Sequence, residues 1–388
     1  MNQQDELRAW LTLLRTPELG PAGLRELLRA HDGSALAALA RPTAELVRSR
    51  QLGNEARAWL RQPDRARLDA DMAWLAQEGH HLLRFVEADF PPQLEDIDQP
   101  PAALFVVGDP ALLLHPQVAI VGARSATPQG LADSREFAAQ LAACGLVVTS
   151  GMADGVDGAA HQAALDAGGR TVAVLGTGAD LVYPRKHAAL AERIAADGAL
   201  VSEFPLATGA RPEHFPRRNR IIAGLSLGTL VIEAGLRSGS LITARLAAEQ
   251  GREVMAVPGS IHNRMKRGCH RLLRDGSRLV ESAAEVRDAL AGPARALGAG
   301  LATRLAAARN DAALGTQHDP DPERAGLLTA LGNDPQSVDV LAERSGLSAS
   351  RVSSLLLELE LDGLAASLPG GRYQRLQPES AGRNERNA

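Results

Sequence analysis

The chain has 388 residues, of which 45% are hydrophobic and 23% are charged, and its formal net charge is -4. This length allows two or three domains, and the charge by itself neither indicates nor excludes a nucleic-acid partner. The only cysteines, Cys144 and Cys269, stand far apart, which excludes a disulfide framework and a cysteine zinc site. The N-terminus is polar and acidic, and no apolar run reaches the ~20 residues that span a bilayer, so we expect a cytoplasmic protein without a membrane partner.

Residues 1–80 are predicted to form a small helical domain, because Leu and Ala recur at spacings of three and four residues. Within it, residues 16–34 have the sequence TPELGPAGLRELLRAHDGS, in which a Gly-Pro turn joins two short helices like a helix-hairpin-helix element (a SAM-like arrangement). That motif can bind DNA phosphates through backbone amides at a helix start. A helical bundle that only packs is the alternative, and we favour it.

An α/β core is predicted over residues 84–290. Its first part, 84–116, is extended and proline-rich, and Val- and Ile-rich stretches then alternate with helical ones. This alternation predicts an extended Rossmann-like, doubly wound and mostly parallel sheet. Right-handed crossovers place the C-terminal ends of its strands at one edge, where ligands bind in such folds. The predicted strands are 117–124, 145–155, 170–180, 198–205, 228–234 and 252–259.

The C-terminal part is predicted to be a linker, a winged helix and a tail. Residues 291–322 are rich in Ala and Gly and aperiodic, which indicates a linker. Residues 323–376 have the order of a winged helix, with Ser348 capping one helix and a hairpin around Gly370-Gly371. The polar residues 377–388 are predicted to be disordered.

The predicted winged helix is not expected to read DNA. Residues 323–376 contain 5 Lys or Arg and 7 Asp or Glu. The second helix of its helix-turn-helix offers one cation, and its last turns carry carboxylates that would face a polyanion. Its leucines either contact a protein partner or pack inside the domain, and the sequence leaves both open. The residues concerned are Arg351, Glu358, Glu360 and Asp362, with Leu355, Leu356, Leu357, Leu359 and Leu361.

The glycine turns of the core lack a cofactor fingerprint. Arg124 stands where the second glycine of a dinucleotide motif lets a pyrophosphate approach, and no P-loop sequence is present. We therefore expect no cofactor. What remains is a set of strand-to-helix turns whose free amides can bind phosphate.

The stretch SGMADGVDGAAH places Asp154, Asp157 and His161 in one turn and helix start. It permits either an acid/base cluster or a capped helix in which His161 packs locally. We favour the capped helix, because no activated nucleophile stands beside the cluster in sequence. No second His or Cys group has ligand spacing, so no metal site is expected.

Positive charge is concentrated on the core. Residues 117–280 contain 19 Lys or Arg and 14 Asp or Glu, a net of +5, whereas the whole chain is -4. Arginine forks match phosphate oxygens, so the stretch FPRRNRIIAG at 215–224 is predicted to face phosphate, held rigid by its apolar helix. At helical spacing Arg217 and Arg220 share a face and Arg218 does not, and we expect one of the three to pair with a carboxylate. Tyr183, Phe204 and Phe215 are the nearby aromatics, which leaves base stacking possible at one or two places.

The stretch EAGLRSGSLITA at 233–244 is a second candidate phosphate turn, in which Ser240 and Thr243 can donate hydroxyl hydrogen bonds. It loosely resembles the phosphate turn of nucleoside-monophosphate phosphoribohydrolases. The alternative function is therefore a nucleotide-binding hydrolase, whose only candidate carboxylate in the motif is Glu233, and a third is a regulatory nucleotide sensor.

Residues 84–280 resemble the family of DNA-processing protein A (DprA, also called Smf). The resemblance rests on FPPQLEDIDQPPAALFVVGD, AIVGAR, SGMADGVDGAAH, AVLGTGADLVYP, SEFP, FPRRNRIIAGLS, VIEAGLRSGSLITA and AVPG, which occur in this order. It implies a core that binds single-stranded DNA, dimerises, protects incoming strands and loads the recombinase RecA during natural transformation, with no established catalytic activity.

The resemblance places the family's DNA-binding basic residues on Arg124 and on one of the pair Arg185 and Lys186, and RRNR matches the family pattern. Together with the turn residues, the predicted DNA-binding residues are Gly122, Arg124, Ser125, Gly151, Arg185, Lys186, Arg217, Arg218, Asn219, Arg220, Ser240 and Thr243.

Overall fold

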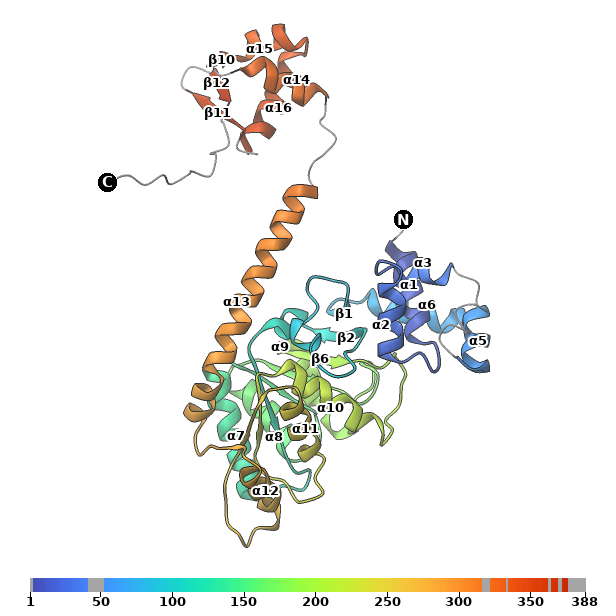
Figure 1. The fold of residues 1–388 in the computed structure, drawn as a ribbon, viewed down its shortest axis with the longest axis vertical. Coiled ribbons are helices and arrows are strands. Elements are labelled where there is room, and N and C mark those ends of the chain that lie inside the picture. The colour runs from blue at the N-terminus through green and yellow to red at the C-terminus, as the bar shows by residue number, and fades with distance from the viewer. Residues whose placement is uncertain are drawn as a thin grey trace, which may run out of the picture. The chain divides into compact units, whose positions relative to one another are not determined.

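The computed structural model describes residues 3–40, 52–315, 322–332, 334–361, 364–368 and 372–375. The chain divides into two compact units, Met1–Ala302 and Thr303–Ala388 (Figure 1). Among the described residues, no helix combines the length and the apolar character that crossing a bilayer requires.

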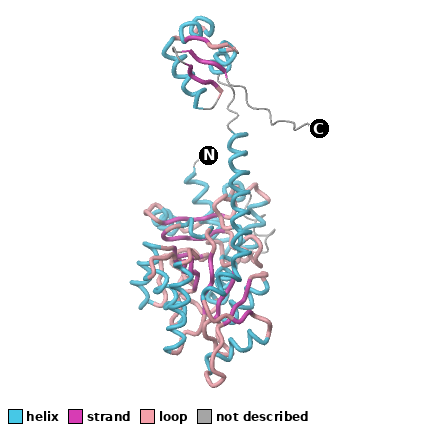
Figure 2. The backbone as a smooth tube through the Cα atoms, turned by 90° about the vertical axis from the view of Figure 1, so that its left-hand side faces the viewer, coloured by secondary structure: helices cyan, strands magenta, loops and turns pink. Residues whose placement is uncertain are grey.

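A nine-stranded sheet in the order β1-β2-β6-β5-β4-β3-β7-β8-β9 forms the centre of the larger unit. Figure 2 shows its strands in magenta among the helices. The strands from β6 to β9 are parallel, and the antiparallel strands β1 and β2 extend one edge. The predicted doubly wound, mostly parallel sheet is thereby confirmed. The strands are β1 (His80–Arg84), β2 (Ala103–Gly108), β3 (Gln117–Val121), β4 (Val147–Ser150), β5 (Thr171–Val174), β6 (Ala199–Ser202), β7 (Gly228–Val231), β8 (Glu253–Ala256) and β9 (Arg278–Leu279).

Helices cover both faces of the sheet, which explains why the strands are apolar throughout. Successive residues of β3 point to opposite faces: Val118 and Ile120 pack with one set of helices, and Ala119 and Val121 with the other. The first set is α7 (Pro128–Ala143), α8 (Val156–Asp166), α9 (Ala188–Asp197) and the start of α13 (Ala283–Gly315); the second is α10 (His214–Leu225), α11 (Ser240–Glu249) and α12 (Arg267–Arg274).

The chain order reverses beside β3. Strands β4 to β6 lie on one side of β3, and β7 to β9 lie on the other. In such sheets the crevice outside the carboxyl ends of the two strands at the reversal is open to a ligand, because the connections leave it in opposite directions. The carboxyl ends of β3 and β7 are therefore where a site is expected.

The N-terminal helices pack against the core. Arg25 on α2 is buried, pairs with Glu95 and donates a hydrogen bond to the carbonyl oxygen of Pro101 at 3.0 Å. Arg15 donates to Asp71 at 2.6 Å and to the carbonyl oxygen of Leu206 at 3.0 Å. The helices are α1 (Gln3–Leu14), α2 (Pro21–Arg29), α3 (Ala35–Leu39), α5 (Asn54–Arg61) and α6 (Arg65–Leu75). Two short 3-10 turns, η1 (Pro92–Leu94) and η2 (Pro110–Leu114), flank β2.

The prediction of an irregular linker at 291–322 is corrected by the structure, which has a helix over most of this range. Residues up to Gly315 are helical and belong to α13, and 316–321 lie outside the described residues. The stretch is aperiodic because its helix stops packing on the core after Leu297, and Leu305 is 65% exposed. Alanine and leucine favour helix without any packed face, so the lack of an apolar period did not indicate a lack of helix.

The smaller unit is a winged helix with its own core. The Ser348 hydroxyl accepts a hydrogen bond from the Arg351 amide at 3.3 Å, which confirms the predicted cap. Leu355, Leu356 and Leu359 are buried within this unit. For these three leucines, packing inside the domain is therefore the correct alternative. The elements are α14 (Pro322–Leu331), β10 (Gln336–Ser337), α15 (Val338–Ser345), α16 (Ala349–Leu361), β11 (Ala365–Leu368) and β12 (Arg372–Arg375). Gly370-Gly371, Asp362, 377–388 and the side chains of Leu357, Glu358 and Leu361 lie outside those described.

Candidate nucleic-acid interface

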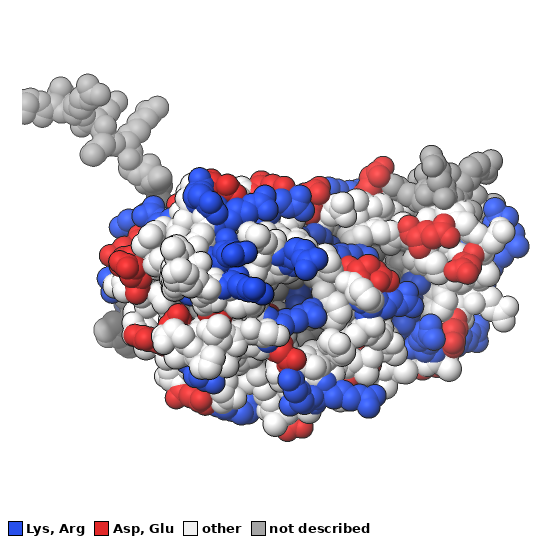
Figure 3. Space-filling model, turned by 90° about the horizontal axis from the view of Figure 1, so that it is seen from below, with Lys and Arg blue, Asp and Glu red and all other residues white. Residues whose placement is uncertain are grey.

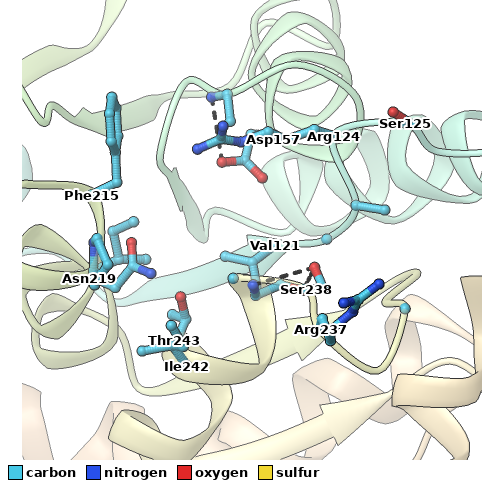
Figure 4. Close-up of a pocket in the computed structure, with 18 of the residues that line it drawn as sticks. Val121, Arg124, Ser125, Asp157, Phe215, Asn219, Arg237, Ser238, Ile242 and Thr243 are labelled. Atoms are coloured by element: carbon cyan, nitrogen blue, oxygen red, sulfur yellow. Dashed lines mark hydrogen bonds between the residues drawn. The ribbon is translucent and has the colours of Figure 1, made fainter. Parts of the chain in front are cut away.

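A cavity of about 980 Å³ opens at the carboxyl ends of β3 and β7 (Figure 4). Residues 121–125 line it after β3 and residues 235–243 after β7, and parts of 210–222 and 264–267 complete its walls. This is the position expected from the reversal of strand order. The cavity is larger than one nucleotide requires, and it is open to one side.

Arginines dominate the wall of this cavity. Five of them are exposed and form no ion pair with a carboxylate among the described residues: Arg124, Arg211, Arg237, Arg264 and Arg267. A sixth, Arg218, is buried, and Asp157 is the single carboxylate among the lining residues. Lys and Arg side chains surround a hollow near the middle of the face seen in Figure 3. Exposed guanidinium groups without carboxylate partners are ready to bind phosphate oxygens.

The inner end of the cavity is polar without being charged. Asn219 from α10 and Thr243 from α11 both project into it (Figure 4). Thr243 is only 2% exposed, and its hydroxyl forms no hydrogen bond with another described residue. The hydroxyls of Ser238 and Ser240 lie 2.7 Å apart at the start of α11, whose first four amides donate to oxygens of Ser238 and Gly239. The hydroxyls and the Asn219 amide, placed this way, can hydrogen-bond to a phosphate or to a base.

Arg218 is fastened to the ends of two strands. Its Nη1 donates to the carbonyl oxygen of Gly151 at 2.8 Å and to that of Val174, and its Nε donates to Asn219 Oδ1 at 3.0 Å. Burial lowers the pKa of Arg218 to about 10, and the charge of Asp157 opposes that shift. A Cβ at Gly151 would lie 2.4 Å from Arg218 Nη2, so a larger residue there would displace the Arg218 guanidinium. Arg218 thus holds Asn219 in place at the cavity floor.

Asp157 is buried beside Arg218, and burial raises the pKa of its carboxyl group. Its Oδ2 accepts hydrogen bonds from the amides of Gly151 at 3.2 Å and Ala153 at 3.4 Å. The predicted helix cap does not form, because α8 begins after Gly155 without a side-chain cap; Asp157 instead binds backbone donors of the turn before the helix.

The sequence profile of the family described as DNA recombination-mediator protein A matches residues 81–291. The chain belongs to this family. Two further profiles match residues 4–44, a DprA-like N-terminal HHH domain, and residues 311–371, a DprA winged helix domain. The resemblance stated from the motifs is thereby confirmed.

Relatives of this DNA recombination-mediator chain align over most of its length. Protein Smf of Escherichia coli (strain K12) is 44% identical over 317 residues, covering 81% of this chain and 82% of that protein. DNA processing protein DprA of Streptococcus pneumoniae is 44% identical over 218 residues, covering 56% and 77%. The X-ray structure of DprA from Streptococcus pneumoniae superposes with a TM-score of 0.65 at 34% identity, covering 72% of this chain and 96% of that one. The structure of the Helicobacter pylori protein, from work on its single-stranded DNA binding mode, gives 0.50 at 29%, covering 55% and 96%.

In this DNA recombination-mediator chain, the three arginines of RRNR separate. Arg217 and Arg220 share a face of α10, as predicted, and both reach Glu203 Oε2, at 3.3 and 2.6 Å. Arg220 is only 7% exposed, so it is the expected carboxylate-paired arginine and does not face phosphate. Neither Arg217 nor Arg220 lines the cavity, and Arg218 enters its wall only as a buried group.

The other residues predicted to bind DNA divide into two groups. Gly122, Arg124, Ser125, Asn219, Ser240 and Thr243 line the cavity. Gly151 lies behind Arg218, and Arg185 and Lys186 stand outside, on the exposed turn η3 (Arg185–His187). Lys186 Nζ lies 2.9 Å from Asp154 Oδ1, which also faces His187 Nε2 at 3.4 Å.

His161 of the recombination-mediator core is a packed residue, as favoured. It is fully buried, its Nδ1 lies 2.7 Å from the Thr171 hydroxyl, and burial lowers the pKa of its imidazole to about 3. The cavity arginines that are not among the residues predicted to bind DNA are Arg211, Arg237, Arg264 and Arg267. The signal for them was present, since 211–220 and 264–274 are basic clusters and Arg237 lies inside the Gly/Ser turn.

Proposed function

We propose that the chain binds single-stranded DNA in the arginine-lined cavity, acts by binding and not by catalysis, and serves DNA processing in the cytoplasm. The observation that carries this is the set of five exposed arginines without carboxylate partners among the described residues, gathered at the carboxyl ends of β3 and β7. The relative from Helicobacter pylori, studied for its single-stranded DNA binding mode, supports the choice of ligand.

The geometry favours a single strand over a duplex. The arginines stand at the rim and wall of the cavity, whereas Asn219 and Thr243 lie at its inner end. A flexible strand can lower an unpaired nucleotide to these groups while its neighbouring phosphates stay with the arginines. A duplex cannot do so without breaking a base pair, which costs free energy. Backbone contacts carry little sequence information, so binding is expected to be sequence-tolerant.

The alternative, a nucleotide-binding hydrolase, lacks a free carboxylate at the turn. Glu233 is fully buried and accepts hydrogen bonds from the Thr127 amide at 2.9 Å, the Thr127 hydroxyl at 2.8 Å and Asn263 Nδ2 at 3.1 Å. It therefore stabilises the start of α7 and does not line the cavity. Asp157, the carboxylate that does, is engaged by backbone amides. Neither group is free to act on a bound nucleotide.

We further propose that the bound strand is protected, and is passed to the recombinase RecA during natural transformation, by a homodimer formed through the core. The family description as a recombination mediator supports the transfer to a recombinase. The sheet edge at β9 supports the dimer, because no strand among the described residues pairs with its outer side and Leu279 on it is 49% exposed. If both protomers cover the bound single-stranded DNA, nucleases cannot reach it.

The test is binding of a single-stranded oligonucleotide, the matching duplex and nucleoside monophosphates across a salt series. Five phosphate contacts give a slope of log affinity against log salt of roughly -3.5, so affinity for the single strand falls about a hundredfold from 50 to 200 mM salt. The duplex is expected to bind more weakly, and the monophosphates are expected to remain intact. Salt-insensitive binding, or release of a base from the monophosphates, would overturn the proposal.

A further inference from the structure

Tyr183 is an exposed aromatic side chain at the rim of the cavity. It is one of two tyrosines in the chain, it is 47% exposed, and it lines the same cavity as the arginines. Its hydroxyl forms no hydrogen bond with another described residue. A large apolar ring left in water beside a ligand cavity is unfavourable by itself, and contact with an apolar part of the ligand would remove that cost.

A second ring lies beside it. The ring centroids of Tyr183 and Phe215 are 5.5 Å apart and their planes are inclined by 44°. The two rings come from different elements, since Tyr183 follows β5 and Phe215 belongs to α10. A Cβ at Gly176 would lie 2.9 Å from Phe215 Cδ1, so this glycine makes room for the ring. The pair is therefore positioned by packing and not by the flexibility of one loop.

Cationic groups accompany both rings of this aromatic pair. The Arg124 guanidinium lies 5.5 Å from the centroid of the Phe215 ring, at the end of β3. Arg185 and Lys186 follow Tyr183 by two and three residues on η3, and both are exposed. Cationic groups are thus available near each of the two rings, and cations beside an aromatic surface suit a nucleotide of a single strand.

We propose that Tyr183 and Phe215 form a stacking platform for one unpaired base, whose neighbouring phosphates contact Arg124 on one side and η3 on the other. This proposal rests on the proposed binding of single-stranded DNA and adds the groups that recognise the base. Stacking on a ring face suits any base and favours the larger purines. It also requires that the base be unpaired, so the platform gives the site a second reason to prefer a single strand.

The test is a thermodynamic cycle on the full-length protein, in which a change in the protein is combined with a change in the oligonucleotide. The variants Tyr183→Leu and Tyr183→Phe are compared with the wild type on two oligonucleotides of equal length, an oligo-deoxyadenylate and the same backbone without bases. Tyr183→Leu is expected to bind the deoxyadenylate about tenfold more weakly, because stacking one base on an aromatic ring is worth on the order of 1.4 kcal/mol. It is expected to bind the abasic backbone as the wild type does. Tyr183→Phe keeps the ring and should match the wild type on both.

Each other outcome has a definite meaning. Equal losses on both oligonucleotides, or no loss on either, would overturn the platform, and a loss shared by Tyr183→Phe would assign the contact to the hydroxyl instead. If Tyr183→Leu does not fold, as judged by its melting temperature, the wild type is used alone. Equal affinity of the wild type for the deoxyadenylate and for the abasic backbone would then overturn the platform. If both oligonucleotides bind with equal, salt-dependent affinity, the platform is wrong but the proposed DNA binding stands. Absence of salt-dependent binding to either strand removes the proposed function itself.

Discussion

Arg220 Nη2 lies 2.6 Å from Glu203 Oε2, and both residues are more than nine-tenths buried. Burial lowers the pKa of Arg220, and the adjacent Glu203 carboxylate opposes that shift. The pair ties the second turn of α10 to the segment after β6, and Arg217 reaches the same carboxylate oxygen from the helix surface. The RRNR motif, which the sequence suggests as a phosphate contact, therefore also stabilises the fold through Arg220.

Replacing Arg220 should destabilise the protein far more than replacing Arg217. Arg220→Ala leaves the buried Glu203 charge without its nearest partner, and breaking a buried pair in this way costs about 3–5 kcal/mol. The Arg217 side chain is 46% exposed, and such exposed pairs contribute about 0–1 kcal/mol. Denaturant unfolding of both variants measures the difference, and equal midpoints would contradict it.

Replacing a cavity arginine should weaken DNA binding without affecting stability. Arg237→Ala removes one exposed guanidinium from the cavity wall. Affinity for a single strand is expected to fall, with the salt slope reduced by about 0.7–1 for the lost phosphate contact. The matched control is Arg193→Ala on α9, an exposed arginine that pairs with Asp166 and lies outside the cavity lining. If the control lowers the slope as much, the cavity is not the binding site.

Removing the charge of Asp154 should strengthen DNA binding. Asp154 holds the Lys186 ammonium at 2.9 Å, and both side chains are exposed, so the carboxylate competes with an incoming phosphate. Asp154→Asn frees that cation, and an exposed pair of this kind is worth up to ~1 kcal/mol, or about fivefold in affinity. Asp166→Asn is the control, since it frees Arg193 away from the cavity. Weaker binding by Asp154→Asn would assign it a positioning role instead.

Stability should decrease as the pH falls below about 6.5, in part because of His161. The Thr171 hydroxyl donates to the Val148 carbonyl oxygen, so His161 must donate from Nδ1, and its Nε2 has no partner among the described residues. Its folded pKa of about 3 lies below the ordinary imidazole pKa of 6.5, so the unfolded chain binds the extra proton between these values.

One such proton lowers the free energy of unfolding by about 1.4 kcal/mol for each pH unit below 6.5, or about 2 kcal/mol at pH 5. His161→Gln should reduce this slope in urea unfolding at pH 7 and pH 5, whereas His262→Gln, an exposed position, should not. The raised pKa of Asp157 acts with the opposite sign at pH values above the ordinary pKa of an aspartate. An unchanged slope in His161→Gln would show that another group is responsible.

Removing the winged helix should leave binding of single-stranded DNA nearly intact. Residues 323–376 carry 5 Lys or Arg against 7 Asp or Glu, and the arginine-lined cavity belongs entirely to the larger unit. A protein lacking residues 300–388 is therefore expected to bind a single strand within about twofold of the full chain, as measured by fluorescence anisotropy. Loss of most of the affinity by a truncated protein that remains folded and dimeric would make the winged helix part of the DNA site.

Local pattern was enough to predict most of the architecture. A run such as Val118 to Val121 is apolar at every position because a parallel strand is buried on both faces, and each such run ends near glycine. The order of these strands and helices predicts the doubly wound sheet and the edge at which ligands bind. The sequence pattern did not reveal that 291–315 is helical, because a helix that does not pack along its length needs no apolar stripe.

The site itself depended on contacts between distant residues. RRNR shows three arginines in a row of four residues, but Glu203 lies 17 positions from Arg220, and the Gly151 carbonyl lies 67 positions from Arg218. Conversely, Arg124, Arg237 and Arg264 come from three separate segments and meet only because parallel strands end at one edge. Residue type and spacing determined which groups could bind phosphate. Only the tertiary structure decided which guanidinium groups are occupied by carboxylate or carbonyl oxygens and which remain exposed to a ligand.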